Sequence, residues 1–223
     1  MGFFCRGRSP IGLLFFIFGI SASGALLSQN TETQRPTSTP YSGDLSIFET
    51  PGRDQRLQIQ RVMDILAIRP GSTVADIGAG SGWFTVRAAA RVGSHGVVYA
   101  EDINPAAIKY INQRIVKEKL SNVKTVLGTP DDPKLPPLSI DAVLFLKVYH
   151  EVAHPLALMA NLKPALQPGA KLGIIDRNGN GTDHGLNSDI LKHEMSEAGF
   201  KLIGSYDFTK TDGQDYFLIF EAK

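Results

Sequence analysis

Hydrophobic positions along the chain follow a helical spacing in some stretches and form short continuous runs in others. Within 54–68, apolar residues recur at i, i+3, i+4 and i+7, which predicts an amphipathic helix that ends at Pro70-Gly71. The same reasoning predicts further helices over 83–92, 104–120, 155–166 and 187–198. Apolar runs predict strands over 73–77, 97–100, 123–127, 142–146 and 171–175.

The C-terminal part departs from this alternation. The stretches 200–208 and 215–223 read as two strands joined without a helix, and such neighbours pair antiparallel. Strands that alternate with helices imply a parallel, doubly wound sheet. We therefore expect an α/β fold: a seven-stranded, mostly parallel sheet with one reversed strand, inside a three-layer α/β/α arrangement. Ligands of such sheets bind beyond the carboxyl ends of the strands.

The first 46 residues predict a leader and a linker. Arg6 and Arg8 precede the apolar run 11–27, which ends in small residues. This order is typical of a secretory signal peptide, and the length also allows an uncleaved membrane anchor. A segment that is neither a signal peptide nor an anchor is the third alternative. The stretch 28–46 is rich in Ser, Thr, Pro and Gln and predicts a flexible linker before a domain at 47–223. An exported or membrane-anchored protein is expected, because the two arginines stay inside.

Composition excludes several kinds of protein. The formal net charge is +1 and basic residues are scattered, so we expect no nucleic-acid partner. Cys5 is the single cysteine of the sequence, which excludes an intrachain disulfide and a multi-cysteine metal site. No group of His, Asp and Glu has the spacing of metal ligands, so no metal is predicted. The oligomeric state stays open.

A glycine-rich turn follows the first predicted strand. Gly78, Gly80 and Gly82 are followed by Trp83, so the third spacing of the dinucleotide pattern G-x-G-x-x-G is missing. Asp76 lies two residues before the first glycine, where an acid suits a ligand with positive charge better than a pyrophosphate. S-adenosylmethionine carries a sulfonium and an amino group and no phosphate. The alternative is a plain strand-to-helix turn.

Acidic residues also follow the second and third predicted strands. Asp102, with Glu101 as the neighbour that could exchange roles with it, lies where an acid reaches ribose hydroxyls, and it would repel the ribose phosphate of NADP. Asp131 or Asp132 can accept a hydrogen bond from an adenine amino group. The alternatives are a helix cap for the first pair and a solvated turn for the second.

With these motifs the sequence resembles the class I S-adenosylmethionine-dependent methyltransferases, in the broad methyltransferase type 11 group. The resemblance covers about 48–223 and rests on the stretches VADIGAGSGWFT, VVYAEDINP, GTPDDPKLPPLSIDAVLFLKVYHEV and NLKPALQPGAKLGIID. It implies the strand order 3-2-1-4-5-7-6, S-adenosylmethionine as cofactor, and an unidentified, small-molecule methyl acceptor. The cofactor site then comprises Asp76, Gly78, Ala79, Gly80, Gly82, Glu101, Asp102, Ile103, Asp131, Asp132 and Lys147.

The loop after the fourth strand is where residues that face the acceptor are expected. Tyr149, His150 and Glu151 are the candidate catalytic residues. The ordinary pKa of a histidine lies near neutral, so His150 is the candidate base for a hydroxyl or amine acceptor, with Glu151 orienting it. Two alternatives stay open: His150 caps a helix or bonds within the core, and positioning alone drives the transfer.

Four further residues qualify this picture. Members of the family often carry an acid near position 147, so Lys147 is a departure. Asp176 and Arg177 end the fifth strand, and His184 follows in a loop that is either a lid or plain connection. Two other functions are kept as alternatives: a noncatalytic binding module of the same fold, and an NAD-dependent oxidoreductase, against which the glycine spacing speaks.

Overall fold

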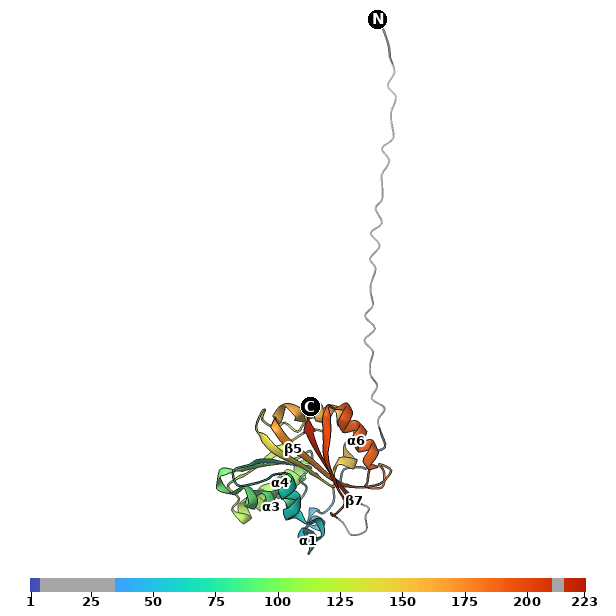
Figure 1. Cartoon of the computed structure of the whole chain (residues 1–223). Helices are drawn as coiled ribbons and strands as arrows, with labels where there is room; N and C mark the ends of the chain where they lie inside the picture. Colours follow the sequence, from blue (N-terminus) through green and yellow to red (C-terminus); the bar gives the residue numbers. More distant parts are fainter. Residues whose placement is uncertain (5–34, 210–214) are drawn as a thin grey trace. The chain divides into compact units, whose positions relative to one another are not determined.

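The computed structural model describes residues 1–4, 35–209 and 215–223 (Figure 1). The chain divides into two units, Met1–Glu32 and Thr33–Lys223, and only residues 1–4 of the first unit are described. The predicted leader comprises residues 1–27, and its apolar run 11–27 therefore lies outside the described residues. The second unit holds the helices and strands of the described chain.

Seven strands form one sheet in the order β3-β2-β1-β4-β5-β7-β6. Strand β1 pairs in parallel with β2 and β4, β2 with β3, and β4 with β5, whereas β7 runs antiparallel to both β5 and β6. This confirms the predicted sheet and its strand order. The strands are β1 (Thr73–Ile77), β2 (Val97–Asp102), β3 (Val123–Leu127), β4 (Ile140–Leu146), β5 (Leu166–Arg177), β6 (Phe200–Tyr206) and β7 (Asp215–Ala222).

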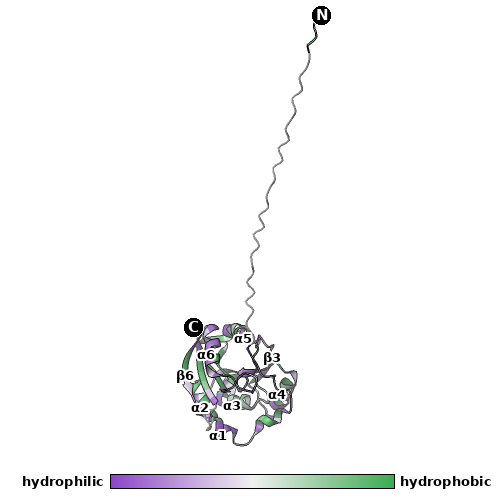
Figure 2. Ribbon diagram, turned by 90° about the vertical axis from the view of Figure 1, so that its right-hand side faces the viewer, coloured by the Kyte–Doolittle hydropathy of each residue, from purple (hydrophilic) through white to green (hydrophobic). Residues whose placement is uncertain are grey.

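Helices cover both faces of the sheet and complete the three layers. Figures 1 and 2 show α3 and α4 on the side opposite α6. The α-helices are α1 (Arg53–Leu57), α2 (Ile59–Ile65), α3 (Trp83–Val92), α4 (Pro105–Glu118), α5 (Pro155–Leu162) and α6 (Ser188–Glu197). The short 3-10 segments are η1 (Leu45–Glu49), η2 (Gly93–His95), η3 (Tyr149–Glu151) and η4 (Lys163–Ala165).

Each face of the sheet has its own hydrophobic core. Because successive side chains of a strand point to opposite faces, Val74 packs in the core under α2, α3 and α4, and Ala75 packs in the core under α5 and α6. The residues predicted to face inward from the first helical stretch are all at most 1% exposed: Ile59, Val62, Met63 and Leu66. The hydrophobic spacing therefore identified the buried face correctly.

Two predicted helices have different bounds in the structure. The helix expected over 54–68 is split into α1 and α2, because Gln58 adopts a left-handed conformation with φ of 46°. The helix expected over 155–166 ends at Leu162. Pro164 has no amide hydrogen to donate within a helix, and it lies in η4, after which Leu166 begins β5.

The described part of the predicted linker, residues 35–46, packs against the domain. Arg35 Nε lies 2.7 Å from Glu194 Oε1. The Ser38 amide donates to the His150 carbonyl at 3.2 Å, and its hydroxyl donates to the Gly181 carbonyl at 3.0 Å. Because Ser38 is only 5% exposed, this stretch is part of the folded unit rather than a tether.

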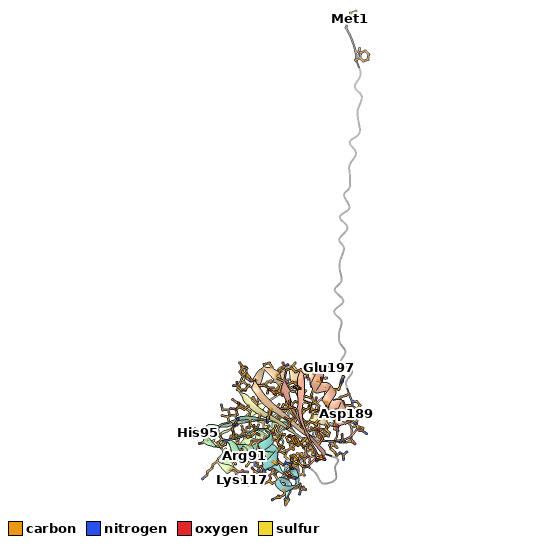
Figure 3. All side chains as sticks on the ribbon, in the orientation of Figure 1. Met1, Arg91, His95, Lys117, Asp189 and Glu197 are labelled. Carbon is orange, nitrogen blue, oxygen red and sulfur yellow. The ribbon has the colours of Figure 1, made fainter. Side chains whose placement is uncertain are left out.

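Charged residues of both signs surround the domain. Figure 3 shows Arg91 of α3, His95 of η2 and Lys117 of α4 on one side of the domain, and Asp189 and Glu197 of α6 on the other. His95 is exposed, as expected for a surface histidine. The spread of charge fits the small net charge of the sequence.

Candidate active site

A cavity of about 600 Å³ opens at the carboxyl ends of the parallel strands. This is the edge at which doubly wound sheets bind ligands, and the volume suits a small molecule. One wall follows β1, β2, β3 and β4, and the opposite wall comes from residues between 37 and 50, here called the N-terminal wall. The first wall is formed by residues 76–81, 83, 84, 101–104, 107, 129, 130, 145–148, 151–153 and 158.

The glycine turn is built as the sequence predicts, with one exception. Gly78 and Gly80 line the cavity with φ of 64° and 55°, a left-handed region that favours glycine. A Cβ on Gly78 would lie 2.4 Å from Val148 Cγ2. Gly82 does not line the cavity; it precedes α3 with φ of 73°, and a Cβ there would lie 3.2 Å from Ile111 Cγ1. Its role is close packing of α3 on α4.

Four carboxyl groups face this cavity from three strand ends. They belong to Asp76, Glu101, Asp102 and Glu151. Burial raises the pKa of Asp76 to about 7, although the Thr85 hydroxyl donates to its Oδ2 at 2.6 Å. Burial also raises the pKa of Glu101 to about 8, that of Glu151 to about 7, and that of Asp102 above its ordinary value. A ligand with positive charge would relieve the cost of ionising them.

Asp102 is held by backbone amides on either side. Gly80 N donates to Oδ2 at 2.9 Å and Asn104 N donates to Oδ1 at 2.8 Å. Ile103, the next residue, is 39% exposed and lines the cavity, as does Ala79. The structure thus brings the predicted acid of the second strand and its apolar neighbour together beside the glycine turn.

Two cationic side chains line the cavity, and both have partners. Arg53 lies 4.3 Å above the Trp83 ring and donates to the Phe48 carbonyl at 2.7 Å, and burial lowers its pKa. Lys147, which was predicted in the cofactor site, lines the cavity, but its Nζ is 2.5 Å from Asp215 Oδ2. Arg53 could not be selected from the sequence, because its helix precedes the first strand.

The acids after the third strand do not reach the cavity. Asp131 Oδ1 lies 2.7 Å from His154 Nδ1, and the carbonyl of Asp132 accepts from Thr129 N at 2.8 Å in a tight turn. Thr129 and Pro130 line the cavity instead. This turn places both Asp131 and Asp132 outside the cavity lining, so the lining does not support the expectation that either holds the adenine.

Tyr149 is a structural residue by its position. It is fully buried and outside the cavity lining, and its hydroxyl donates to Glu194 Oε2 at 3.0 Å. The rings of Phe145 and Tyr149 pack edge to face at 5.9 Å, and burial raises the Tyr149 pKa well above its ordinary value. The predicted catalytic role does not fit this placement.

His150 forms a buried pair with Asp176. Its Nδ1 lies 2.8 Å from Asp176 Oδ1, and its amide donates to Oδ2 at 3.0 Å. Because an ionised carboxylate only accepts, Nδ1 carries the proton and Nε2 is left as the acceptor. Nε2 lies 3.8 Å from Glu151 Oε1, and the ring of His184 meets that of His150 edge to face at 5.8 Å.

This arrangement changes one expectation from the sequence. No metal-ligand spacing is visible along the chain, yet within the described residues the ligand atoms of His150, Glu151 and His184 lie within 4.8 Å of one another. His184 is far away in sequence, in the loop between β5 and α6. A spacing search cannot find such a group, because only the fold brings its members together.

Comparison with solved structures places this fold. A SAM dependent methyltransferase from Aquifex aeolicus superposes with a TM-score of 0.72 at 22% identity, over 80% of this chain and 98% of that one. The cyclase SpnF superposes with a TM-score of 0.65 at 12% identity, over 83% and 87%. Proteins with this fold therefore carry out more than one kind of reaction, so the function must be argued from the site and from the family.

The fold and the acid-lined glycine turn define the class of S-adenosylmethionine-dependent methyltransferases, with S-adenosylmethionine as the cofactor of that class. A family model described as a methyltransferase domain matches residues 68–216. The chain belongs to this methyltransferase domain family, and the resemblance stated from the motifs is confirmed. These matches favour a methyltransferase over an NAD-dependent oxidoreductase.

Curated relatives match part of the chain. The arsenite methyltransferase of Halobacterium salinarum is 26% identical over 157 residues, which is 70% of this chain and 40% of that protein. The ubiquinone/menaquinone biosynthesis C-methyltransferase of Ectopseudomonas mendocina is 27% identical over 122 residues, 54% and 48%. The matched region thus spans less than half of the length of these relatives.

The predicted location is contradicted by these findings. The relatives are named for arsenite methylation and for quinone biosynthesis. Within residues 1–4, 35–209 and 215–223, no helix is both long and apolar enough to cross a membrane. The expectation of an exported or membrane-anchored protein is therefore withdrawn. The segment 11–27 on which it rested lies outside the described residues.

Proposed function

We propose that this protein transfers the methyl group of S-adenosylmethionine to a small molecule bound in the same cavity. One observation carries the proposal: the buried carboxyl groups of Asp76, Glu101 and Asp102 lie at the glycine turn, while the lining cations Arg53 and Lys147 already have partners. A sulfonium and an ammonium group supply the positive charge that this cavity lacks. A dinucleotide would bring further negative charge to it.

The proposal assigns the parts of the cofactor to the two strand ends. Asp76 and the turn of Gly78 and Gly80 hold the methionine part. Asp102 accepts from the ribose hydroxyls, with Glu101 beside it, and Ile103 packs on the adenine. Support comes from the cavity lining, which contains all of these residues, and from the exposed side chain of Ile103.

The acceptor is proposed to be small and partly apolar. Leu45, Ile47 and Phe48 give the N-terminal wall an apolar surface within the cavity lining. A cavity of about 600 Å³ suits small molecules. The names of the relatives, an arsenite and a quinone-pathway methyltransferase, support the same class of acceptor without identifying it.

The transfer is a displacement at the methyl carbon. A lone pair of the acceptor forms a bond to that carbon, the carbon–sulfur bond breaks, and its electrons stay on sulfur, which gives S-adenosylhomocysteine. Positioning both reactants supplies about 7–11 kcal/mol of the barrier. For an acceptor that loses a proton, we propose His150 Nε2 as the base, because Asp176 holds the other ring nitrogen and Glu151 connects this pair to the cavity.

Calorimetry on the full chain tests the proposal. We expect S-adenosylmethionine and S-adenosylhomocysteine each to bind at one site, and NAD to give no heat of binding. Binding of NAD, or of none of the three, would overturn it. Acceptors with a hydroxyl, amine, thiol or carboxylate group, and arsenite, are then tested for formation of S-adenosylhomocysteine. If none reacts although the cofactor binds, the domain is the noncatalytic module.

A further inference from the structure

Three potential metal ligands meet at the carboxyl ends of β4 and β5. His150 and Glu151 lie in η3, and His184 lies in the loop between β5 and α6. One ligand atom from each lies within 4.8 Å of the other two. Glu151 also lines the cavity, so this cluster borders the space where the acceptor is proposed to bind.

His150 is held as metal-binding histidines usually are. Asp176, which is fully buried, accepts a hydrogen bond from His150 Nδ1 at 2.8 Å and from the His150 amide at 3.0 Å. A carboxylate on one ring nitrogen fixes the tautomer and the ring orientation, and makes the other nitrogen a better ligand. The free nitrogen, Nε2, lies 3.8 Å from Glu151 Oε1.

The loop that carries His184 is closed by its own hydrogen bonds. Gly181 N donates to the Gly185 carbonyl and Leu186 N donates to the Arg177 carbonyl, both at 2.8 Å. The backbone of His184 has φ of 56°, and its amide donates to Ser38 Oγ at 3.0 Å. Such a conformation is unfavourable for a residue with a side chain and persists where the surroundings enforce it, often at functional sites.

From this geometry we propose that His150, Glu151 and His184 bind a divalent transition-metal ion. Two imidazoles and one carboxylate form a ligand set typical of Zn²⁺ and related ions, and three protein ligands leave coordination positions open. Bonds of about 2.0–2.2 Å bring ligand atoms to within about 4 Å of each other, so the cluster contracts slightly on binding. The exposed side chain of His184 is the ligand that moves.

The site narrows the class of acceptor, and this step rests on the proposed function. An ion held by these three residues would act as a Lewis acid and lower the pKa of an acceptor hydroxyl, whose proton would then pass to water. The resulting oxygen lone pair bonds to the methyl carbon while the carbon–sulfur electron pair stays on sulfur. His150 then acts as a ligand rather than as a base, and the preferred acceptors are oxygen acids and not amines.

Metal binding is tested on the full chain without a histidine tag, after treatment with a chelator. Calorimetry with Zn²⁺, and separately with Mn²⁺, is expected to show one ion per chain. His184→Ala should weaken Zn²⁺ binding by at least tenfold, and Asp176→Asn by about 10–100-fold. His193→Ala is the matched control: this histidine lies on α6 with a side chain that is 82% exposed, and its removal should change nothing.

Cofactor affinity separates this proposal from the proposed function. On the same samples, His184→Ala should keep the wild-type affinity for S-adenosylhomocysteine and the wild-type thermal unfolding temperature, because its side chain is exposed. Wild-type Zn²⁺ affinity in this variant, or no ion bound to the wild type, overturns the metal site. Zn²⁺ binding that depends on His184 in a protein that binds no S-adenosylhomocysteine keeps the metal site and refutes the methyl transfer.

Discussion

The two ends of the cavity are built in different ways. At one end, the glycine turn and the acids at 101 and 102 come from two consecutive strand-helix units, and the parallel ladder of β1 and β2 fixes their spacing. Beyond Glu151, which lines the cavity at its other end, His150, Asp176 and His184 come from two loops and a strand end and are not part of the lining. The comparison teaches that the proposed cofactor end is a local motif, whereas the proposed acceptor end is assembled only in the folded chain.

The electrostatics of the two ends differ as well. Carboxyl groups with raised pKa values crowd the glycine turn, where a cationic ligand is the missing partner. At the other end, Asp176 pairs with His150, and the next carboxylate, Glu151, is 3.8 Å from the free ring nitrogen. We expect one end to bind a cationic ligand, and the other end to accept a proton or to hold a metal ion.

The largest expected effect separates chemistry from cofactor binding. His150→Ala should lower turnover by about 10²–10⁴-fold, since it removes the base or the metal ligand, and should leave affinity for S-adenosylhomocysteine nearly unchanged. Steady-state rates and calorimetry measure the two. His154→Ala, which removes an exposed histidine bonded to Asp131, is the control and should keep full turnover. Joint loss of turnover and affinity would show that His150 supports the whole cavity.

The next effect concerns the cofactor end alone. Asp102→Ala should weaken binding of S-adenosylhomocysteine by about 10–100-fold, because hydrogen bonds to a charged group contribute about 1.5–3 kcal/mol. Calorimetry compares it with Asp131→Ala, which the sequence placed in the same site and the structure places outside the cavity lining. Equal affinities in the two variants would remove the ribose assignment.

A smaller effect follows from the raised pKa values of Asp76 and Glu101, about 7 and about 8. Both groups are protonated at low pH, so affinity for cationic S-adenosylmethionine should rise between pH 6 and 9, by at most about tenfold per pH unit for each proton released. S-adenosylhomocysteine, which lacks the sulfonium charge, should respond less. Calorimetry measures the affinity for S-adenosylmethionine across this pH range, and in Glu101→Gln the affinity should change less with pH. A wild-type affinity that does not change with pH would contradict the charge argument.

The same groups give the ligand-free protein the opposite trend. An acid with a raised pKa binds more protons in the folded state than in the unfolded state, so the free energy of unfolding falls as pH rises from about 4 to about 8. Thermal unfolding without ligand over this range checks the sign. Cofactor should restore the lost stability most strongly at the upper end.

The smallest effect concerns a residue that the sequence placed in the reaction centre. Tyr149→Phe removes the hydrogen bond to Glu194 and should cost about 0.5–1.5 kcal/mol of unfolding free energy. The unfolding temperature should fall by about 2–4 °C per kcal/mol, with turnover unchanged. A tenfold loss of turnover would place the Tyr149 hydroxyl at the acceptor.

The sequence predicted the sheet better than the acceptor site for a physical reason. A buried strand such as β1 needs an apolar run, and the predicted bounds of β1 and of the edge strand β3 are those observed. The break at Gln58 was missed because a left-handed residue other than glycine carries no sequence signal. Glycines and acids beside one strand can be read locally, as Gly78 and Asp102 show.

Contacts between distant segments were beyond such reasoning. Asp131 was assigned from its place after a strand, and a tight turn directs it away from the cavity. The polar stretch before residue 46 looked unable to pack, yet Ser38 is buried against the loop that holds His184. Pairing a segment with a partner more than a hundred residues away depends on the complete fold.

The N-terminal wall also has a consequence for kinetics. This wall belongs to no strand of the sheet, and hydrogen bonds of the Glu49 side chain and of the Ser38 amide hold it at two points. Glu49 Oε1 accepts from Ser81 Oγ at 2.7 Å and from Arg114 Nη1 at 2.5 Å, and the Ser38 amide donates to the His150 carbonyl at the other point. Because hydrogen bonds join the wall to the domain at those points, we expect ligands to exchange by detachment of the wall without a change in the sheet. Motions of this kind take about microseconds to milliseconds. They would make the time for which a product stays bound depend on the wall, independently of the rate at which the product forms.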